Sequence, residues 1–499
     1  MTDKTTPLDR QLDAENLDPE NWDEMRALGH RMIDDVVDYL SSVRERPVWQ
    51  PPSESMRAFL SQEVPSEPME PSTVYDQFVE HIRPYPLGNI HPRFWAWYMG
   101  NGTVMGAYAE LLAATMNSNA GAGKHGPMVV EEQVIDWMRE LLGLPQESSG
   151  LLVSGGSMAN LVGLVVARHA KSSFDHRQYG YQFGPGATAK PMRIYGSAEL
   201  HSCNQKALEL MGMGHEGLVR IPVDTNYCVD MALLRKAIED DMAAGFQPIC
   251  VIGTSGTVNT GAIDDLQGIA DLCDEFGLWF HIDGAIGAIA VLADDLRGRL
   301  AGLERADSIA LDLHKWLHVP FEAGCIMVRH GDQHKDAFSL IPEYLAKEAS
   351  GVASGINWAS EYGVQLSRQF RALKIWMTFK EHGTVKLGRM MSKNVEQAHY
   401  LAARIEATEG LELVAPVGLD IVCYRAIVPG FSVDALNALN KRILTDMQES
   451  GTAVPSYTTL NGVYCIRVAI SNHRSEQADF DLLVDETVRL AAKLAIEAV

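Results

Sequence analysis

The stretch Pro248–Ala285 decides the fold that this sequence predicts: PICVIGTSGTVNTGAIDDLQGIADLCDEFGLWFHIDGA. It begins with Pro248–Gly253, a run that is apolar on both faces, as in a strand buried inside a parallel sheet. A helical pattern follows at Leu266–Phe276, and a second apolar run, Leu278–Asp283, comes directly after it. A strand, a helix and a strand in this order indicate two parallel strands joined by a crossover helix.

The same alternation continues on both sides of this stretch. We predict further strands at Leu151–Ser154, Met192–Tyr195, Leu218–Pro222, Ser308–Leu311 and Gly324–Arg329, and helices at Met158–His169, His201–Met211 and Met231–Ala244. The sequence therefore predicts an α/β fold with a mostly parallel central sheet and helices on both faces. In such sheets the ligand site lies beyond the carboxyl ends of the strands.

Different patterns precede and follow this region. Met25–Val43 has helical periodicity, and the prolines from Pro47 to Pro71 predict an extended arm, with a solvated linker as the alternative. Beyond residue 380 we predict helices at Lys386–Glu406, Val433–Glu449 and Asp479–Ala498, and strands at Glu412–Val414, Ile421–Ala426 and Tyr464–Ala469. We therefore expect a helical and extended N-terminal arm at 1–90, of a kind common at dimer interfaces. A large α/β domain at 91–380 and a small α+β domain at 381–499 would follow it.

The composition excludes several classes of protein. Of 499 residues, 46% are hydrophobic and 21% charged, and 42 basic against 65 acidic residues give a net charge of −23. Such an acidic chain disfavours nucleic acids and anionic membranes as partners. The seven cysteines are widely spaced without a C-x-x-C pair, which indicates reduced thiols in a cytoplasmic protein. The polar N-terminus lacks a signal-peptide pattern, and no apolar run is long enough to span a membrane.

Two charged residues at predicted strand ends indicate chemistry. Lys315 stands between His314 and Trp316, and an amine in such poorly hydrated surroundings becomes a better nucleophile that forms Schiff bases with aldehydes. The alternative is a surface lysine whose stem covers the tryptophan. Asp283 ends its strand, where a carboxylate either pairs with a cationic ring nitrogen or caps a helix.

Two further segments add to this pattern. Ser154-Gly155-Gly156-Ser157 joins a strand to a helix, so its glycines and the helix N-terminus favour a phosphate, or the segment is an ordinary turn. It matches neither a Walker loop nor G-x-G-x-x-G. His201 follows a strand, where it would stack on a planar cofactor or serve only the structure.

Together these segments resemble the group II pyridoxal-phosphate decarboxylases, the family of aromatic-L-amino-acid decarboxylase. The resemblance runs from about residue 20 to the C-terminus. It is carried by residues 151–168, the segment around His201, 253–257 with 261–264, 281–285, 314–316, 91–94 and 367–374. It implies a fold-type I enzyme with covalent pyridoxal 5'-phosphate, acting as a homodimer with its active site at the interface.

The resemblance also implies a role for each matching residue. Lys315 holds the cofactor as an internal aldimine, Asp283 pairs with the pyridinium nitrogen, and His201 stacks on the ring and helps to place the substrate. Gly156, Ser157 and His314 lie around the phosphate, and Thr257 or its neighbours touch the ring substituents; the family's threonine aligns with Val258. Tyr344 lies on a mobile loop that serves the neighbouring subunit, and its hydroxyl reprotonates the substrate carbon.

The implied reaction is decarboxylation of an L-amino acid to an amine and carbon dioxide. The alternative is an aldehyde-forming or other lyase reaction on the same cofactor, although tyrosine at 344 favours plain decarboxylation. Three departures from the family pattern, at Leu313, Met99-Gly100 and Gly121–Pro127, predict a reshaped substrate pocket. Lys124 and His125 are candidates for binding an acidic or hydroxylated side chain, or are structural.

Two other classes compete with this interpretation. A metal hydrolase would use His281, Asp283 and His314, because residues two apart on a strand face the same side. A binding protein that kept the fold would bind no cofactor. We expect no metal in this protein, because the resemblance supplies a complete cofactor site without one.

Overall fold

The computed structural model describes residues 16–180, 190–340, 347–355 and 357–497. They form two compact units, whose outer limits are residues 1–87 and 88–499. The predicted limits at 90 and 380 stay predictions. Residue 380 lies inside α14 (Ala372–Glu406), whose backbone is kinked nearby at Gly383. None of the described helices is long and apolar enough to cross a membrane.

The first unit consists of helices. Its elements are α2 (Trp22–Ser41), η1 (Val43–Glu45), α3 (Glu54–Phe59), α4 (Pro71–Gln77) and η2 (Phe78–Ile82). The segment from Pro47 to Pro71 contains one short helix, α3, and is otherwise non-helical until α4 begins; its role as an arm stays a prediction. The Ser53 side chain caps α3, and α4 begins with Pro71, at a position where a helix tolerates proline.

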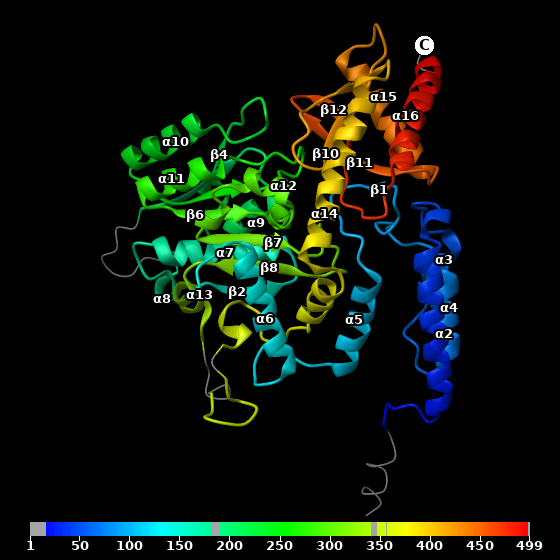
Figure 1. Cartoon of the computed structure of the whole chain (residues 1–499), viewed down its shortest axis with the longest axis horizontal. Helices are drawn as coiled ribbons and strands as arrows, with labels where there is room; N and C mark the ends of the chain where they lie inside the picture. Colours follow the sequence, from blue (N-terminus) through cyan, green and yellow to red (C-terminus); the bar gives the residue numbers. More distant parts are fainter. Residues whose placement is uncertain (1–15, 181–189, 341–346, 356, 498–499) are drawn as a thin grey trace, which may run out of the picture. The chain divides into compact units, whose positions relative to one another are not determined.

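A seven-stranded sheet forms the centre of the second unit (Figure 1). Its strands are β2 (Ser149–Val153), β3 (Met192–Ser197), β4 (Leu218–Ile221), β5 (Gln247–Thr254), β6 (Trp279–Asp283), β7 (Ser308–Asp312) and β8 (Gly324–Val328). Their order is β2-β8-β7-β6-β5-β3-β4, and only β8 runs antiparallel to its neighbours. The predicted mostly parallel sheet is confirmed.

Helices cover both faces of this sheet. Along β7, Ile309 and Leu311 join one buried core and Ala310 joins the other, as the alternation of a strand requires. The first core includes residues of α6 (Gly126–Leu141), α10 (Met231–Ala244) and α11 (Leu266–Phe276). The second includes residues of α7 (Gly156–Lys171) and α9 (Ser202–Leu210). The predicted α/β fold with two covered faces is therefore confirmed.

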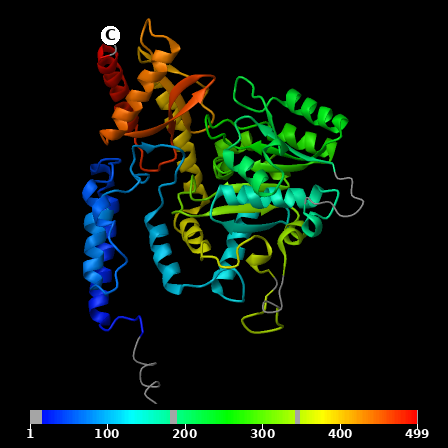
Figure 2. The same cartoon turned by 180° about the vertical axis from the view of Figure 1, so that it is seen from behind.

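A second sheet, with the order β1-β11-β12-β10-β9, contains the C-terminal strands. These are β1 (Phe94–Trp95), β9 (Leu411–Leu413), β10 (Ile421–Ala426), β11 (Val454–Leu460) and β12 (Val463–Ala469). They pair antiparallel, except β1 with β11. Helices α14, α15 (Val433–Glu449) and α16 (Gln477–Glu497) share one core with this sheet (Figure 2). Ile421, Cys423 and Cys465 join the core of the larger sheet instead.

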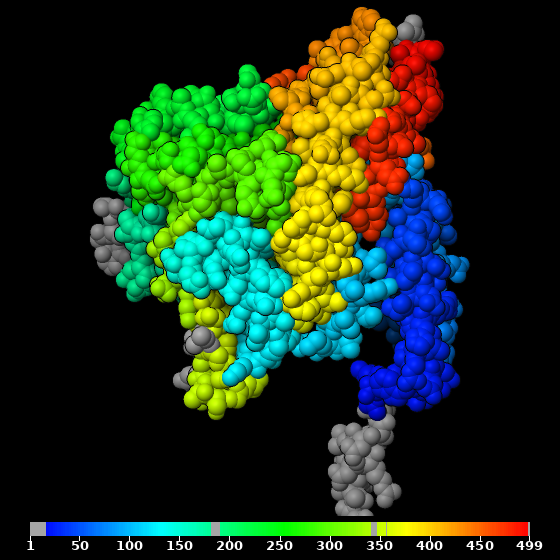
Figure 3. Space-filling model, in the orientation of Figure 1, coloured from blue at the N-terminus to red at the C-terminus, as the bar shows by residue number. Residues whose placement is uncertain are grey.

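Helix α14 connects the two regions of the second unit. It packs against α6 and α5 (Val104–Met116), and Figure 3 shows it in yellow at the surface beside α6 in cyan. At Gly383 its backbone leaves the helical conformation with φ 66°. The remaining short helices of this unit are α8 (His176–Tyr179), α12 (Asp294–Arg297) and α13 (Gly331–Phe338), with 3₁₀ turns at Ala288–Leu292 and Ala359–Glu361 among others.

Candidate active site

A cavity of about 670 Å³ lies where the carboxyl ends of β5, β6 and β7 meet. Strand β2 runs in the same direction as β7, because β8 is antiparallel to both. The turn Ser154–Ser157 after β2 therefore reaches the same edge of the sheet and lines the cavity. Strands β11 and β12 supply the opposite wall through Ser456, Tyr457 and Arg467. The cavity lies where α/β sheets place their ligands.

Lys315 follows β7 and lines this cavity. Its Nζ lies 3.0 Å from Oδ2 of Asp312, and its side chain is only 21% exposed. The sequence predicted an amine in apolar surroundings, whereas the structure shows an amine with a buried carboxylate as its partner. The ion pair holds the amine at the strand end, with its direction fixed by a charge-assisted hydrogen bond.

Asp283 is the last residue of β6 and is buried in the wall of the same cavity. Its Oδ2 accepts a hydrogen bond of 2.9 Å from Nδ2 of Asn204, a residue of α9. Its Oδ1 lies 3.4 Å from the backbone nitrogen of Ala285. A buried carboxylate with so few donors is stabilised by a cation. The cavity leaves room for that cation to come from a ligand.

The N-terminus of α7 reaches the cavity through two glycines. The Gly156 N–H donates to Oδ1 of Asp312, and a Cβ at Gly156 would lie 2.7 Å from Oδ2 of the same residue. A Cβ at Gly324 would lie 2.5 Å from the backbone of Gly155. The glycines thus allow a close approach between this helix end, β7 and β8. Ser157 is exposed on the same turn, where the helix dipole and free N–H groups favour an anion.

Two histidines of the cavity are held by backbone hydrogen bonds. His201 precedes α9, and its Nδ1 accepts the Cys203 N–H at 3.2 Å. Burial lowers the pKa of His201, so the ring is neutral at pH 7 and carries its proton on Nε2. Nδ1 of His314 lies 3.1 Å from the carbonyl oxygen of Ala323, and burial lowers the pKa of this ring as well.

One predicted site residue, Thr257, does not line the cavity, and another lies outside the described residues. Thr257 is buried, and its hydroxyl contacts that of Thr260 at 2.9 Å and accepts the Ala262 N–H at 3.1 Å. It holds the loop after β5, while its neighbours Val258 and Asn259 line the cavity. Tyr344 lies outside the described residues.

Three residues of this region were missed by the sequence analysis: Asp312, Asn204 and Arg467. Arg467 is 3% exposed; its Nε donates to the Asn259 carbonyl and its Nη1 to the Ser456 hydroxyl, both at 3.2 Å. Its Nη2 is buried without a partner among the described residues. The cavity wall therefore contains a cationic donor available to a ligand. A charge inside the apolar strand Val463–Ala469 was the signal that could have identified it.

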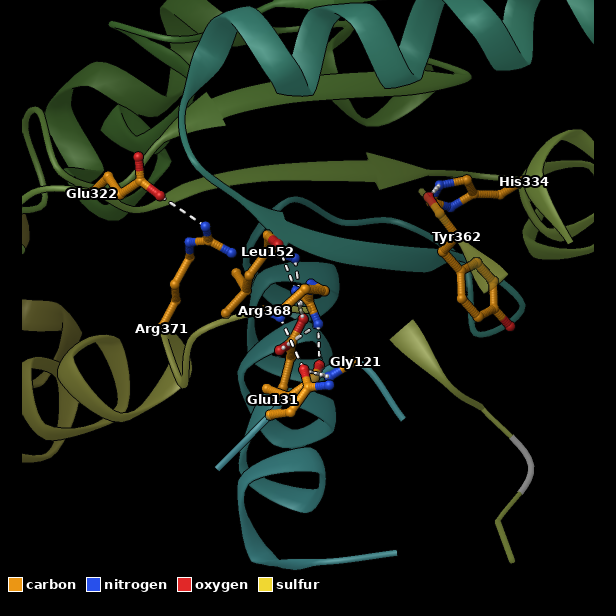
Figure 4. A network of polar contacts seen from close by, with 10 residues as sticks. Gly121, Glu131, Leu152, Glu322, His334, Tyr362, Arg368 and Arg371 are labelled. Atoms are coloured by element: carbon orange, nitrogen blue, oxygen red, sulfur yellow. Dashed lines mark hydrogen bonds and ion pairs between the residues drawn. The ribbon is translucent and has the colours of Figure 1, made fainter. Parts of the chain in front are cut away.

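A buried ion pair outside the cavity lining supports strand β2 (Figure 4). Nη2 of Arg368 contacts Oε1 of Glu131 at 2.5 Å, and the same guanidinium donates to the carbonyls of Ala120 and Leu152. This pair ties the segment before α6 to strand β2, whose end forms the glycine turn. Lys124 and His125 lie in that segment but do not line the cavity of this chain.

The hydrolase alternative has no support from His281. Its Nε2 lies 2.8 Å from Oδ1 of Asn160, and its Nδ1 lies 2.7 Å from the Ser308 hydroxyl. Both ring nitrogens are therefore engaged inside the protein. Among the residues that the structure describes, no group of three His, Cys, Asp or Glu side chains is arranged to hold a metal ion.

The residues of the cavity fit pyridoxal phosphate. Lys315 offers an amine for the aldehyde, Asp283 a carboxylate for the ring nitrogen, and the N-terminus of α7 an anion site for the phosphate. The test is Asp283, a buried carboxylate in the cavity wall whose side-chain donor is Asn204 and which can take a cationic partner from a ligand. The donor set and the space agree with a planar, phosphorylated aldehyde.

Known proteins place the chain in a family. The pyridoxal-dependent decarboxylase conserved domain matches residues 52–427. An aromatic-L-amino-acid decarboxylase of Bacillus atrophaeus is 32% identical over 95% of this chain and 97% of its own length. Tyrosine decarboxylase 1 of Narcissus pseudonarcissus is 27% identical over 95% and 94%, respectively. A crystal structure of Oryza sativa TDC with PLP and tryptamine has a TM-score of 0.87 at 25% identity, covering 96% of this chain and 100% of that one. This chain belongs to the pyridoxal-dependent decarboxylase family: it is an amino-acid decarboxylase that uses pyridoxal phosphate.

Proposed function

We propose that the protein decarboxylates an aromatic L-amino acid in this cavity, with Lys315 as the residue that binds the cofactor. The observation that carries the proposal is the meeting of Lys315, Asp283 and the N-terminus of α7 around one cavity. When bound, pyridoxal phosphate supplies an electron sink for the pair that the departing carbon dioxide leaves on Cα. The curated relatives include decarboxylases named for aromatic substrates.

Each residue has a defined task in this proposal. Asp283 holds the proton on the ring nitrogen, because a buried carboxylate stabilises the cationic form of its partner. His201 offers its Nε2 proton as a hydrogen-bond donor and packs against the ring. Lys315, once free of the cofactor, acts as a base or an acid that exchanges a proton with the substrate. Tyr344 donates the proton that Cα receives after carbon dioxide leaves. The turn at Gly156 and Ser157 and the side chain of His314 surround the phosphate.

The walls of the cavity support an aromatic substrate. Trp97, Met99 and Tyr457 line it, and Trp97 and Tyr457 are more than half exposed, so they offer free apolar surface. Aromatic and sulfur-containing side chains bind rings favourably. Arg467 favours a second candidate, an amino acid with an acidic side chain, because its unpaired Nη2 would bind a carboxylate.

We also propose a homodimer, which the exposed apolar surfaces of both units support. Helix α2 buries no residue within its unit, and its Met32 and Val37 are 42% and 44% exposed. Helix α5 exposes Leu111, Leu112 and Met116 by half or more. Contiguous apolar helix faces of this kind are typical of subunit interfaces. Light scattering of the purified protein tests this, and a monomer would overturn it.

A cytoplasmic location is part of the proposal, supported by seven free cysteines.

An absorbance spectrum tests the central proposal. The purified protein is expected to show the visible band of lysine-bound pyridoxal phosphate, and Lys315→Ala to lack it. Lys335→Ala, which removes a lysine outside the cavity, is the control that retains the band. Carbon dioxide and an equivalent amount of amine are expected from one of L-tryptophan, L-tyrosine, L-phenylalanine or L-dopa. Release from L-glutamate or L-aspartate alone would replace the aromatic proposal with the acidic one.

Product analysis decides between decarboxylation and the aldehyde-forming alternative. Phenylacetaldehyde synthase of Arabidopsis thaliana is 28% identical to this chain, over 92% of the chain and 94% of that protein. Plain decarboxylation gives amine without hydrogen peroxide. Stoichiometric aldehyde, ammonia and peroxide would overturn the proposal in favour of the oxidative reaction.

A further inference from the structure

A second cavity, of about 220 Å³, lies apart from the active site and has a basic lining. It lies where α5 and α14 run side by side (Figure 1), next to the turn that follows β12. The side chains that characterise it are His318, His382, Lys386, His473 and Arg474. None of these residues lines the larger cavity.

His318 lies in the wall of this second cavity, and its imidazole ring has no hydrogen-bond partner among the described residues. The residue is 2% exposed, yet neither Nδ1 nor Nε2 finds a partner among the described residues. Its backbone has φ 58°, which residues other than glycine and asparagine rarely adopt. A buried imidazole without partners costs free energy. A ligand that accepts its N–H would remove that cost.

Among the charged side chains of this cavity, Arg474 and Lys386 outnumber Glu381, which favours a negatively charged ligand. Nδ1 of His382 is also buried without a partner. Burial, and to a smaller extent the electrostatic effect of Arg474 and His382, lowers the pKa of His318 to about 3. Burial, and to a smaller extent the electrostatic effect of His318 and Arg474, lowers the pKa of His473 to about 2. These two rings are therefore neutral at pH 7, while Arg474 and Lys386 bring positive charge. Glu381 lines the same cavity and lies 3.4 Å from His382.

We propose that this cavity binds a small oxyanion, a phosphate or a carboxylate, between Arg474, Lys386 and the His318 N–H. An oxyanion accepts hydrogen bonds from all three donors at once, whereas a cation would meet two like charges. The N-terminus of α5, at Thr103 and Val104, lies on the same cavity and adds its helix dipole. The site is independent of the decarboxylation that we propose for the larger cavity.

The second cavity is next to the segment that presents Lys315. The backbone N–H of His318 donates to the Lys315 carbonyl at 3.2 Å, whereas its ring nitrogens face no partner among the described residues. Asn101 contacts Nδ1 of His473 through its side chain at 2.7 Å, and its neighbour Gly100 packs directly on the His314 carbonyl. Binding is therefore expected to restrain residues 99–101 and 313–319, which carry Met99, His314 and Lys315 of the active-site cavity.

Titration of the pyridoxal-phosphate-loaded enzyme with inorganic phosphate tests the proposal. Because the bound cofactor already occupies the anion site at α7, inorganic phosphate that binds must bind elsewhere. Broadening of its ³¹P line, or calorimetry, measures that binding. We expect saturable binding at constant ionic strength, and reduced hydrogen exchange in residues 313–319 and 381–390. Lys386→Gln and His318→Asn are each expected to weaken binding about tenfold or more, the loss of one charge-assisted hydrogen bond. Asparagine tolerates the positive φ at 318.

Arg389→Gln is the matched control. It removes the same charge from the same part of α14, and Arg389 does not line this cavity. Unchanged phosphate affinity in this variant supports the proposal. An equal loss in Arg389→Gln and Lys386→Gln, or no saturable binding to the wild-type enzyme by either phosphate or acetate, would overturn it. If acetate displaces phosphate, the site also binds carboxylates. If acetate cannot displace phosphate, the site is specific for phosphate.

Discussion

At the scale of single residues, Asp283 is the side chain whose charge matters most to the proposed reaction. Asp283→Asn keeps the shape and the hydrogen bond to Asn204 but removes the charge opposite the ring nitrogen. We expect kcat/KM to fall by roughly 10²–10³-fold, the usual cost of losing a preorganised electrostatic contact. Steady-state kinetics with cofactor in excess measure this.

The control for this variant is Asp307→Asn. Asp307 is a partly buried aspartate that accepts the Phe280 N–H outside the active-site cavity. It is expected to leave kcat near the wild-type value. If Asp283→Asn retained wild-type kcat/KM at saturating cofactor, the role given to Asp283 would be wrong.

Arg467 is the residue that we expect to position the substrate. Arg467→Gln removes the unpaired Nη2 donor from the cavity wall. We expect kcat/KM to fall by roughly 10–10²-fold, because a hydrogen bond from a charged donor contributes about 1.5–3 kcal/mol. The visible cofactor band is expected to stay unchanged. Arg425→Gln, on the neighbouring strand, is the control, and an equal fall in both variants would contradict the prediction.

The sequence identified the charged strand-end residues but not their partners. Lys315 and Asp283 were visible because a charge after an apolar run is unusual. The pairing of Lys315 with Asp312 was foreseeable, since the two residues are three apart in one turn. The contact between Asn204 and Asp283 was not, because it joins two elements whose distance only the folded sheet defines.

At the scale of secondary-structure elements, the pair Arg368–Glu131 is the strongest candidate for a stabilising contact. The two side chains are 1% and 6% exposed. Glu131→Gln leaves the guanidinium without its buried counter-charge, which costs about 3–5 kcal/mol. Thermal unfolding is expected to move to a clearly lower temperature.

Glu275→Gln provides the comparison for this change. It breaks the pair with Arg235, in which the two side chains are 43% and 53% exposed, and such exposed pairs contribute little to stability. A Glu131→Gln variant as stable as Glu275→Gln would show that the buried pair does not anchor β2.

The pattern of apolar residues predicted where elements lie better than how they pair. Helices α10 and α11 and strand β10 have the predicted bounds, because amphipathic or apolar periodicity defines them locally. Strand β8 was predicted in position, but its antiparallel direction was not, since a buried strand is apolar in either direction. Strand β11 was missed because Pro455 and its exposed threonine and tyrosine interrupt the apolar pattern.

At the scale of the whole molecule, buried neutral histidines are expected to make the protein sensitive to acid. Burial lowers the pKa of His281 and His334 to about 4, that of His318 to about 3 and that of His473 to about 2. Each has a pKa near 6.5 in the unfolded chain. As the pH falls below about 6.5, the unfolded chain binds protons that the folded chain does not, so stability falls.

Two carboxyl groups act in the opposite direction. Burial raises the pKa of Asp264 to about 6 and that of Asp420 to about 7, so the folded chain binds their protons first and gains stability as the pH falls. Four histidines outweigh two carboxyl groups. We expect a lower urea midpoint at pH 5 than at pH 7.5, measured at high salt to screen the net charge. An equal or higher midpoint at pH 5 would contradict this.

His334→Asn and His215→Asn separate this effect from other titrations. His334 is fully buried, whereas the His215 side chain is 67% exposed. The first substitution is expected to reduce the difference between the two midpoints, and the second to leave it unchanged.

The antiparallel insertion of β8 has a consequence for synthesis on the ribosome. Strand β2 ends at Val153, and its hydrogen-bonded neighbour among the described strands, β8, begins only at Gly324. The glycine turn after β2 is thus made long before the strand that supports it. A nascent chain released before Gly324 leaves this edge unpaired and open to association with other chains. Cofactor capture is therefore expected to begin only after most of the larger sheet has been synthesised.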